Sequence, residues 1–101
     1  MKDRVIDKYV LVRSGDSGVH FGTLAAWDGT TALLTDSRRL WEWDTGGTGI
    51  SLSEVAVCGI KQATSKITMV LPEIIILGVC EIIPCHGMAI ATITGAATYT
   101  P

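Results

Sequence analysis

The chain has 101 residues, a length that suits one domain with a single hydrophobic core. Eight lysines and arginines stand against ten aspartates and glutamates, and the basic residues are scattered, so the charge pattern argues against binding of bulk DNA or RNA. Hydrophobic residues make up 48% of the chain and charged residues only 18%. This apolar excess predicts that part of the surface is covered by another subunit.

The charged N-terminus lacks the apolar segment of a signal peptide, so we expect a cytosolic protein. The most hydrophobic tract, residues 67–84, is interrupted by Pro72, Glu73 and Glu81 and contains no run of the roughly 20 apolar residues that a membrane-spanning helix needs. Three cysteines without an export signal predict free thiols. Their spacing matches no common zinc motif, so neither a metal nor another cofactor is expected.

The first part of the chain predicts three strands joined by tight turns. Residues 8–14 are rich in β-branched and aromatic side chains and are followed by a Gly-Asp-Ser-Gly turn sequence. The run of residues 19–29 ends in Asp28-Gly29, which favours a two-residue hairpin turn, and residues 30–36 form the third strand. The second run is apolar on both faces, which predicts that it lies inside a layered fold or at an interface.

The next segment, residues 37–44 ("SRRLWEWD"), concentrates two arginines and two tryptophans. If it is extended, its side chains alternate between two faces: Arg39, Trp41 and Trp43 on one, Arg38, Leu40 and Glu42 on the other. A cation beside indole rings suits a flat anionic ligand such as a nucleotide. A packed stripe, with the guanidinium paired to a carboxylate, is the alternative. Either Arg38 or Arg39 is expected to reach solvent or a phosphate, because consecutive residues point to opposite faces.

A glycine-rich loop and a short helix follow. Residues 44–51 contain three glycines and predict a flexible or tightly turned loop. Ser51 stands three residues before Glu54, a capping-box spacing that predicts a helix from Ser51 to about residue 58, ended by Gly59.

The last part of the chain predicts further strands and one ambiguous element. After a polar connection, residues 67–71 and 74–83 are expected to form two strands, or one long strand bent at Pro72. The tail after Pro84 fits a helix in its apolar spacing, whereas its threonines and glycines weaken that prediction.

Three more residues join Arg38, Arg39, Trp41 and Trp43 as candidate ligand-binding residues. Ser51 begins the short helix, where free backbone N–H groups and those of the glycine loop suit an anion; a plain connection is the alternative. His20 is a ligand contact or a core residue, and Arg13 lines the same pocket edge or belongs to a solvated turn. The only histidines, His20 and His86, sit in no catalytic motif, so we expect no enzymatic activity.

Together these elements predict one α+β domain over residues 1–101, a small twisted, mainly antiparallel sheet or partial barrel with one short helix. Because so small a domain cannot easily enclose a nucleotide, a pocket shared between subunits is favoured. The small size of the domain and its excess of apolar residues both predict a homo-oligomer.

Over residues 9–84 the chain resembles a family of small uncharacterised proteins encoded mainly by tailed bacteriophages. The resemblance rests on the order of the segments "YVLVRS", "GVHFGTL", "RRLWEWD", "SLSEVAV" and "EIIPC". Its most specific part is the Arg-Arg-Leu-Trp-x-Trp run. A longer glycine loop, residues 45–49, and a more apolar tail distinguish this chain from that family.

The resemblance implies a phage origin and a place of action in the host bacterial cytoplasm. In its small size and its lack of a catalytic motif, the chain is also similar to phage proteins that sequester the nucleotide signals of bacterial antiviral defence. These signals include cyclic nucleotides and ADP-ribose derivatives. The implied function is non-catalytic binding of such a signal. The alternatives are a phage structural or protein–protein interaction module that uses the Trp-rich strand, and a single-stranded nucleic-acid binder, which the acidic balance disfavours.

Overall fold

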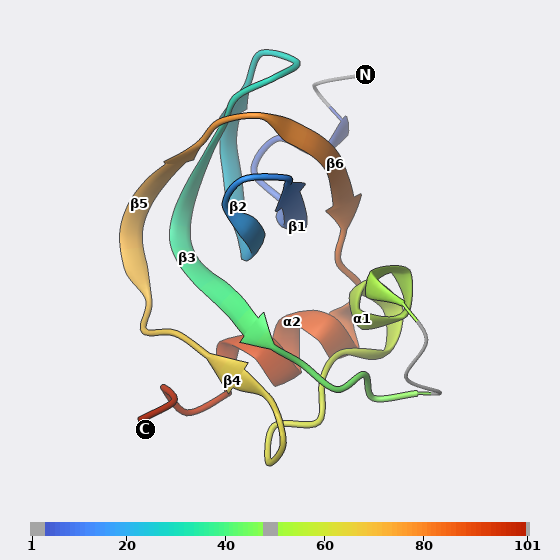
Figure 1. Ribbon diagram of the computed structural model, residues 1–101. Coiled ribbons are helices and arrows are strands. Elements are labelled where there is room, and N and C mark those ends of the chain that lie inside the picture. Colours follow the sequence, from blue (N-terminus) through green and yellow to red (C-terminus); the bar gives the residue numbers. More distant parts are fainter. Residues whose placement is uncertain (1–3, 48–50, 101) are drawn as a thin grey trace.

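The computed structural model describes residues 4–47 and 51–100 and contains one strongly curved antiparallel sheet with two short helices at one end (Figure 1). The elements are β1 (Tyr9–Ser14), β2 (Gly18–Trp27), β3 (Ala32–Glu42), α1 (Leu52–Cys58), β4 (Lys66–Ile67), β5 (Leu71–Ile76), β6 (Val79–Pro84) and α2 (Gly87–Thr94). This is the α+β fold that the sequence predicted. Neither helix has the length and apolar character that crossing a bilayer requires, as far as the described residues go.

The sheet order is β4-β3-β2-β1-β6, and β5 also pairs with β3. Strand β3 is long enough to pair with β5 through its first half and with β4 through its second half. Strands β5 and β6 follow each other in the chain but lie on opposite edges of the sheet, β5 beside β3 and β6 beside β1. The chain therefore arches across the end of the sheet, as Figure 1 shows, and gives it the form of a partial barrel.

The bend between these strands lies at Leu77 and Gly78, and the expected break at Pro72 is wrong. Gly78 has a φ of 64°, and the hydroxyl of Ser14 donates a hydrogen bond to the Leu77 carbonyl at 2.8 Å. Pro72 lies inside β5, at a position that has no partner in the register with β3. A proline without an N–H is tolerated there because β5 is an edge strand of the sheet.

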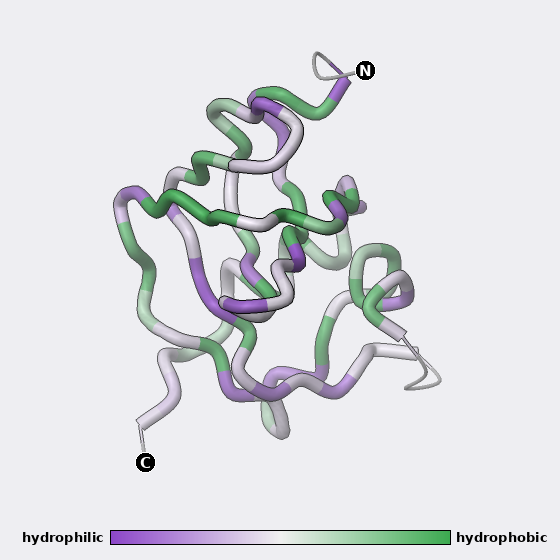
Figure 2. The backbone as a smooth tube through the Cα atoms, turned by 45° about the horizontal axis from the view of Figure 1, so that its top comes forward, coloured by the Kyte–Doolittle hydropathy of each residue, from purple (hydrophilic) through white to green (hydrophobic). Residues whose placement is uncertain are grey.

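The sheet is buried on both faces by two hydrophobic clusters. One contains Phe21 and Leu40 from the sheet together with Val55 and Ile93 from the two helices. The other lies inside the curl and is built from residues of β1, β2, β3 and β5. The hydrophobic chain of β5 and β6 crosses the sheet beside this second cluster (Figure 2). Burial on two sides explains why β2 is apolar on both faces, as the sequence indicated.

Both helices are held by their termini. The Ser51 hydroxyl accepts a hydrogen bond from the backbone N–H of Glu54 at 3.4 Å, and the N–H of Gly59 donates to the Val55 carbonyl, so α1 has the predicted cap and end. The ambiguous tail forms α2, whose Thr92 hydroxyl accepts from the N–H of Ile60 at 3.1 Å. This contact joins the two helices next to Gly59.

Candidate functional site

The alternation predicted for the Arg-Arg-Leu-Trp run is present through Trp41, and it separates the two arginines. Arg38 and Leu40 are buried, whereas Arg39 and Trp41 are exposed. The Arg38 guanidinium donates from Nε to the Thr68 carbonyl at 2.8 Å and from Nη1 to the carbonyls of Ile93 at 2.9 Å and Ala96 at 2.6 Å. Burial lowers the pKa of this guanidinium. These bonds connect β3 to the end of α2. Arg38 therefore faces no external ligand, and its prediction as a ligand-binding residue is wrong.

Arg39 takes the opposite position, with its side chain in solvent and its backbone fixed. Its N–H donates to the Thr68 hydroxyl at 2.9 Å, and its carbonyl accepts from the Thr68 N–H at 3.0 Å. Within the described ranges, the guanidinium takes part in no ion pair. It borders a shallow cavity of about 190 Å³ whose other walls are His20, Ser37, Thr68, Met69, Leu71 and Ile74.

Trp41 and Tyr99 form an aromatic pair beside a lysine. The ring centroids are 5.8 Å apart at an interplanar angle of 68°, and 60% of Trp41 is exposed. The Lys66 ammonium lies 5.2 Å from the Trp41 centroid and 5.0 Å from the Tyr99 centroid, at cation–π distance from both. It also contacts Glu42 at 3.2 Å, and this hydrogen bond is the main reason why the pKa of Lys66 is raised.

These residues lie on one continuous surface. The rings and Lys66 line a cavity of about 330 Å³ that shares Thr68 and Met69 with the cavity beside Arg39. Residues two apart on one face of a strand are separated by about 7 Å, so Arg39 and Trp41 are neighbours. We call the group Arg39, Trp41, Lys66, Met69 and Tyr99 the β3–β4 surface. Its polar groups are two cations beside two aromatic rings.

Trp43, Ser51 and Arg13 lie elsewhere, in contrast to the expected pocket. Trp43 is partly buried against the helix-side core, because β3 ends at Glu42 after a register shift that interrupts the alternation. Ser51 caps α1, and the part of the glycine loop at residues 48–50 lies outside the described residues. Arg13 is paired with Glu81 across β1 and β6 at 3.2 Å, with β2 between it and β3.

His20 is a buried residue that lines the cavity beside Arg39. It is 1% exposed and pairs in register with Arg39 on β3. Its Nε2 lies 3.0 Å from the Ser17 carbonyl, and among the described atoms Nδ1 has no partner. Burial lowers the pKa of His20, and the charge of Arg39 lowers it further, against the opposing effect of the Ser17 carbonyl. A neutral imidazole therefore lies below the exposed guanidinium.

The buried His20 makes stability depend on pH. Because its pKa is lowered from 6.5, the unfolded chain takes up the proton at a higher pH than the folded protein. The contribution of neutral His20 is complete above about pH 6.5 and is lost as the pH falls toward the folded pKa. We expect the urea midpoint to drop between about pH 7.5 and about pH 5, and to drop less for His20→Gln.

The control for this measurement is His86→Gln, which changes the other, exposed histidine at the start of α2. It should follow the wild-type pH dependence. An equal drop for His20→Gln and the wild-type protein would show that other groups cause it.

Lys66, Met69 and Tyr99 were missed by the sequence interpretation. Tyr99 is far along the chain from Trp41 and reaches it because its N–H donates to the Ile67 carbonyl at 2.9 Å, which adds the tail to the end of β4. No local pattern indicates this contact, since Tyr99 stands between polar residues in an irregular segment. The lysine was treated as part of a polar connection. Lys66 becomes a candidate ligand contact only because it lies beside Trp41 on the neighbouring strand.

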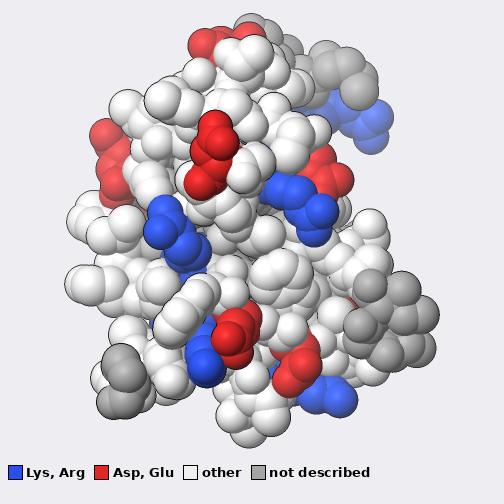
Figure 3. Space-filling model, viewed as in Figure 1, with Lys and Arg blue, Asp and Glu red and all other residues white. Residues whose placement is uncertain are grey.

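Three further features bear on the chemistry of the described residues: their metal-ligating side chains, the Cys85 thiol and the surface charge. No three of their His, Cys, Asp and Glu side chains are grouped as a metal site would need. Burial raises the pKa of the Cys85 thiol to about 12, so this thiol stays protonated and is a poor nucleophile. On the face seen in Figure 3, charges of both signs are interspersed, without the continuous basic stripe that tracks a nucleic-acid backbone.

Residues 7–93 match a protein-family model described as a domain of unknown function, DUF6948. No curated protein and no solved structure matches the chain.

Proposed function

The chain belongs to the family of the domain of unknown function DUF6948, and for this member we propose non-catalytic binding of a nucleotide on the β3–β4 surface. The observation that carries the proposal is that Lys66 lies at cation–π distance from the exposed rings of Trp41 and Tyr99. The adjoining cavity is bordered by Arg39, whose guanidinium forms no ion pair among the described residues.

The chemistry of this surface matches the two parts of a nucleotide. A base stacked on an exposed indole contributes about 1–3 kcal/mol, and Trp41 is 60% exposed although Lys66 lies 5.2 Å from its ring centroid. A guanidinium binds a phosphate through two parallel hydrogen bonds, and that of Arg39 has no competing carboxylate among the described residues. Lys66 already shares its charge with Glu42, so Arg39 is the principal phosphate contact.

The nucleotide class follows from the resemblance to phage proteins. We propose that the ligand is a host immune signalling nucleotide, either cyclic or an ADP-ribose derivative, and that the protein sequesters it in the host cytoplasm. Sequestration needs no catalytic group. The cavities of about 190 and 330 Å³ are shallow for such a ligand. This supports a homo-oligomer in which a second subunit completes the enclosure.

The test is a panel of cyclic dinucleotides, cyclic trinucleotides and ADP-ribose compounds, measured by thermal shift and calorimetry on the purified protein. A ligand at about 1,000 times its dissociation constant adds about 4 kcal/mol of stability. A hit identifies the signal, whereas uniform silence from a folded protein rejects nucleotide binding.

For a hit from this panel, we expect Arg39→Ala to abolish binding and to leave the melting temperature close to wild type, because the side chain is exposed. The matched control is Arg13→Ala, which removes an arginine remote from the surface and should leave affinity unchanged. Calorimetry and thermal melts on both variants separate the two roles. Equal affinity of Arg39→Ala and wild-type protein would remove the phosphate contact from the proposal.

The second candidate is a protein-interaction module, favoured by a row of exposed apolar side chains. Five lie from the end of β4 up to and including the β5–β6 bend: Met69, Val70, Leu71, Ile75 and Leu77. Strand β5 is also an edge strand, and exposed edges are ready to pair with another chain. A second copy of this chain is the proposed partner, and light scattering of the ligand-free protein distinguishes a monomer from an oligomer.

A further inference from the structure

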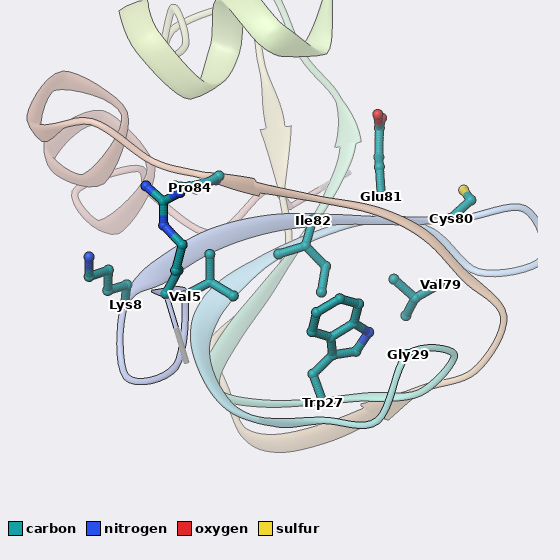
Figure 4. A pocket seen from close by; sticks show the side chains of 10 residues that line it. Val5, Lys8, Trp27, Gly29, Val79, Cys80, Glu81, Ile82 and Pro84 are labelled. Atoms are coloured by element: carbon teal, nitrogen blue, oxygen red, sulfur yellow. The ribbon is translucent and has the colours of Figure 1, made fainter. Parts of the chain in front are cut away.

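A larger groove lies away from the β3–β4 surface and shares none of its residues. It runs between the segment before β1, the turn from β2 to β3, and strand β6, and has a volume of about 940 Å³ (Figure 4). This volume lies within the range of small-molecule sites, about 300–1,000 Å³. Neither the proposed nucleotide contacts nor the core requires such an opening.

The middle of the groove is apolar. Val5, Trp27, Val79 and Ile82 are half-buried and pack on the cluster inside the sheet. In Figure 4 the side chains of Val5 and Ile82 point toward the Trp27 indole. A ligand lying here would cover apolar side chains that the protein leaves half in water, a favourable exchange of about 25 cal/mol per Å².

One end of the groove is cationic. Arg4 and Lys8 line it, both are exposed, and neither forms an ion pair with any residue that the structure describes. Glu81 lines the groove at a distance from Lys8 in Figure 4, and its charge is already balanced by Arg13 at 3.2 Å. The free charge of the groove is therefore positive and gathered at one end.

The Trp27 indole carries the third feature. Its Nε1–H is buried and has no acceptor within the described part of the chain. Figure 4 shows this nitrogen on the side of Val79 and Gly29, and Lys8 at the other end of the groove. Buried N–H groups without an acceptor are rare and costly, so an oxygen supplied by a ligand would complete this one.

From these three features we propose that the groove binds an aliphatic anion with a second oxygen at its far end. The anionic head pairs with Lys8 and Arg4, the chain covers Val5 and Ile82, and the distal oxygen accepts from Trp27 Nε1. The head is a carboxylate or a phosphate ester. This site shares no residues with the proposed nucleotide site, so each of the two proposals is tested separately.

The probe is 10-hydroxydecanoate, which has one carboxylate, an aliphatic chain and a distal hydroxyl. Its matched control is 1,10-decanediol, which has the same chain length and distal hydroxyl but an uncharged hydroxymethyl group in place of the carboxylate. We expect calorimetry to give one site per chain, with the diol about two- to five-fold weaker, the scale of an exposed charge pair. 10-Hydroxydecyl phosphate, which keeps the distal hydroxyl and is compared in parallel, decides between a carboxylate and a phosphate head. Failure of all three to bind, or equal affinity of the acid and the diol, would overturn the proposal.

Charge reversal locates the head. Lys8→Glu should remove the preference for the acid over the diol, whereas Lys61→Glu, which reverses an exposed lysine outside the groove, should keep it. Both variants change the net charge equally, so a general electrostatic effect would move both. Nucleotide binding, if present, should survive Lys8→Glu.

Discussion

Replacing Arg38 with methionine should destabilise the protein by about 3–5 kcal/mol, because three carbonyl acceptors lose their donor and each buried unsatisfied acceptor costs about 1–3 kcal/mol. Methionine keeps the aliphatic volume but leaves the carbonyls of Thr68, Ile93 and Ala96 without their donor. A domain of this size has only about 5–15 kcal/mol in total. The variant is therefore expected to melt far below the wild-type protein or to be partly unfolded at 25 °C.

Urea unfolding of Arg38→Met and Arg39→Met tests this directly. The two substitutions are adjacent and chemically identical, but Arg39 is exposed and its change should stay within about 0.5 kcal/mol. If the two variants lose equal stability, the carbonyl contacts of Arg38 do not hold the tail. If only Arg38→Met is destabilised, the first arginine of the run is structural and the second is free for a ligand.

Gly59→Ala should cost about 3 kcal/mol or more. Gly59 has φ 78° and ψ −160°, a region that is almost closed to residues with a side chain and costs about 1–3 kcal/mol. A Cβ at this position would also collide with the Thr92 hydroxyl and lie 2.9 Å from the Met88 carbonyl oxygen. Both atoms belong to α2, so the added methyl group forces the two helices apart.

The matched control is Gly87→Ala, at the start of α2, where nothing lies within 4 Å of the added Cβ. Alanine is the better helix former, so this variant should be as stable as the wild-type protein or slightly more stable. Thermal melts of both variants suffice. A wild-type melting temperature for Gly59→Ala would mean that the helices separate at little cost.

The sequence predicted those features that depend on neighbours in the chain. Strands β1 to β3 came from β-branched runs and turn dipeptides, and the ends of α1 from Ser51 and Gly59. The alternation of Arg38 and Arg39 was also local, and it correctly required one of the two to face outward. It did not say which one, because that depends on the side of β3 against which the helices pack.

The features that the sequence did not predict depend on contacts between residues far apart in the chain. The acceptors of Arg38 stand 30, 55 and 58 residues away, and Tyr99 reaches Trp41 only through the tail's contact with β4. The bend at Gly78 was missed for the same reason. Pro72 is the stronger local signal for a break, but an edge strand accommodates it.

The arch from β5 to β6 has a consequence for synthesis on the ribosome. Strand β1 is made early, yet one of its two neighbours in the sheet is β6, and Arg38 stays without two of its acceptors until Ile93 and Ala96 have emerged. Folding dominated by such distant pairings is slow. A nascent chain that has already exposed β5 can place Ile76 in the cluster formed with β1, β2 and β3, but β1 keeps an open edge until β6 has emerged, and such unpaired edges favour aggregation.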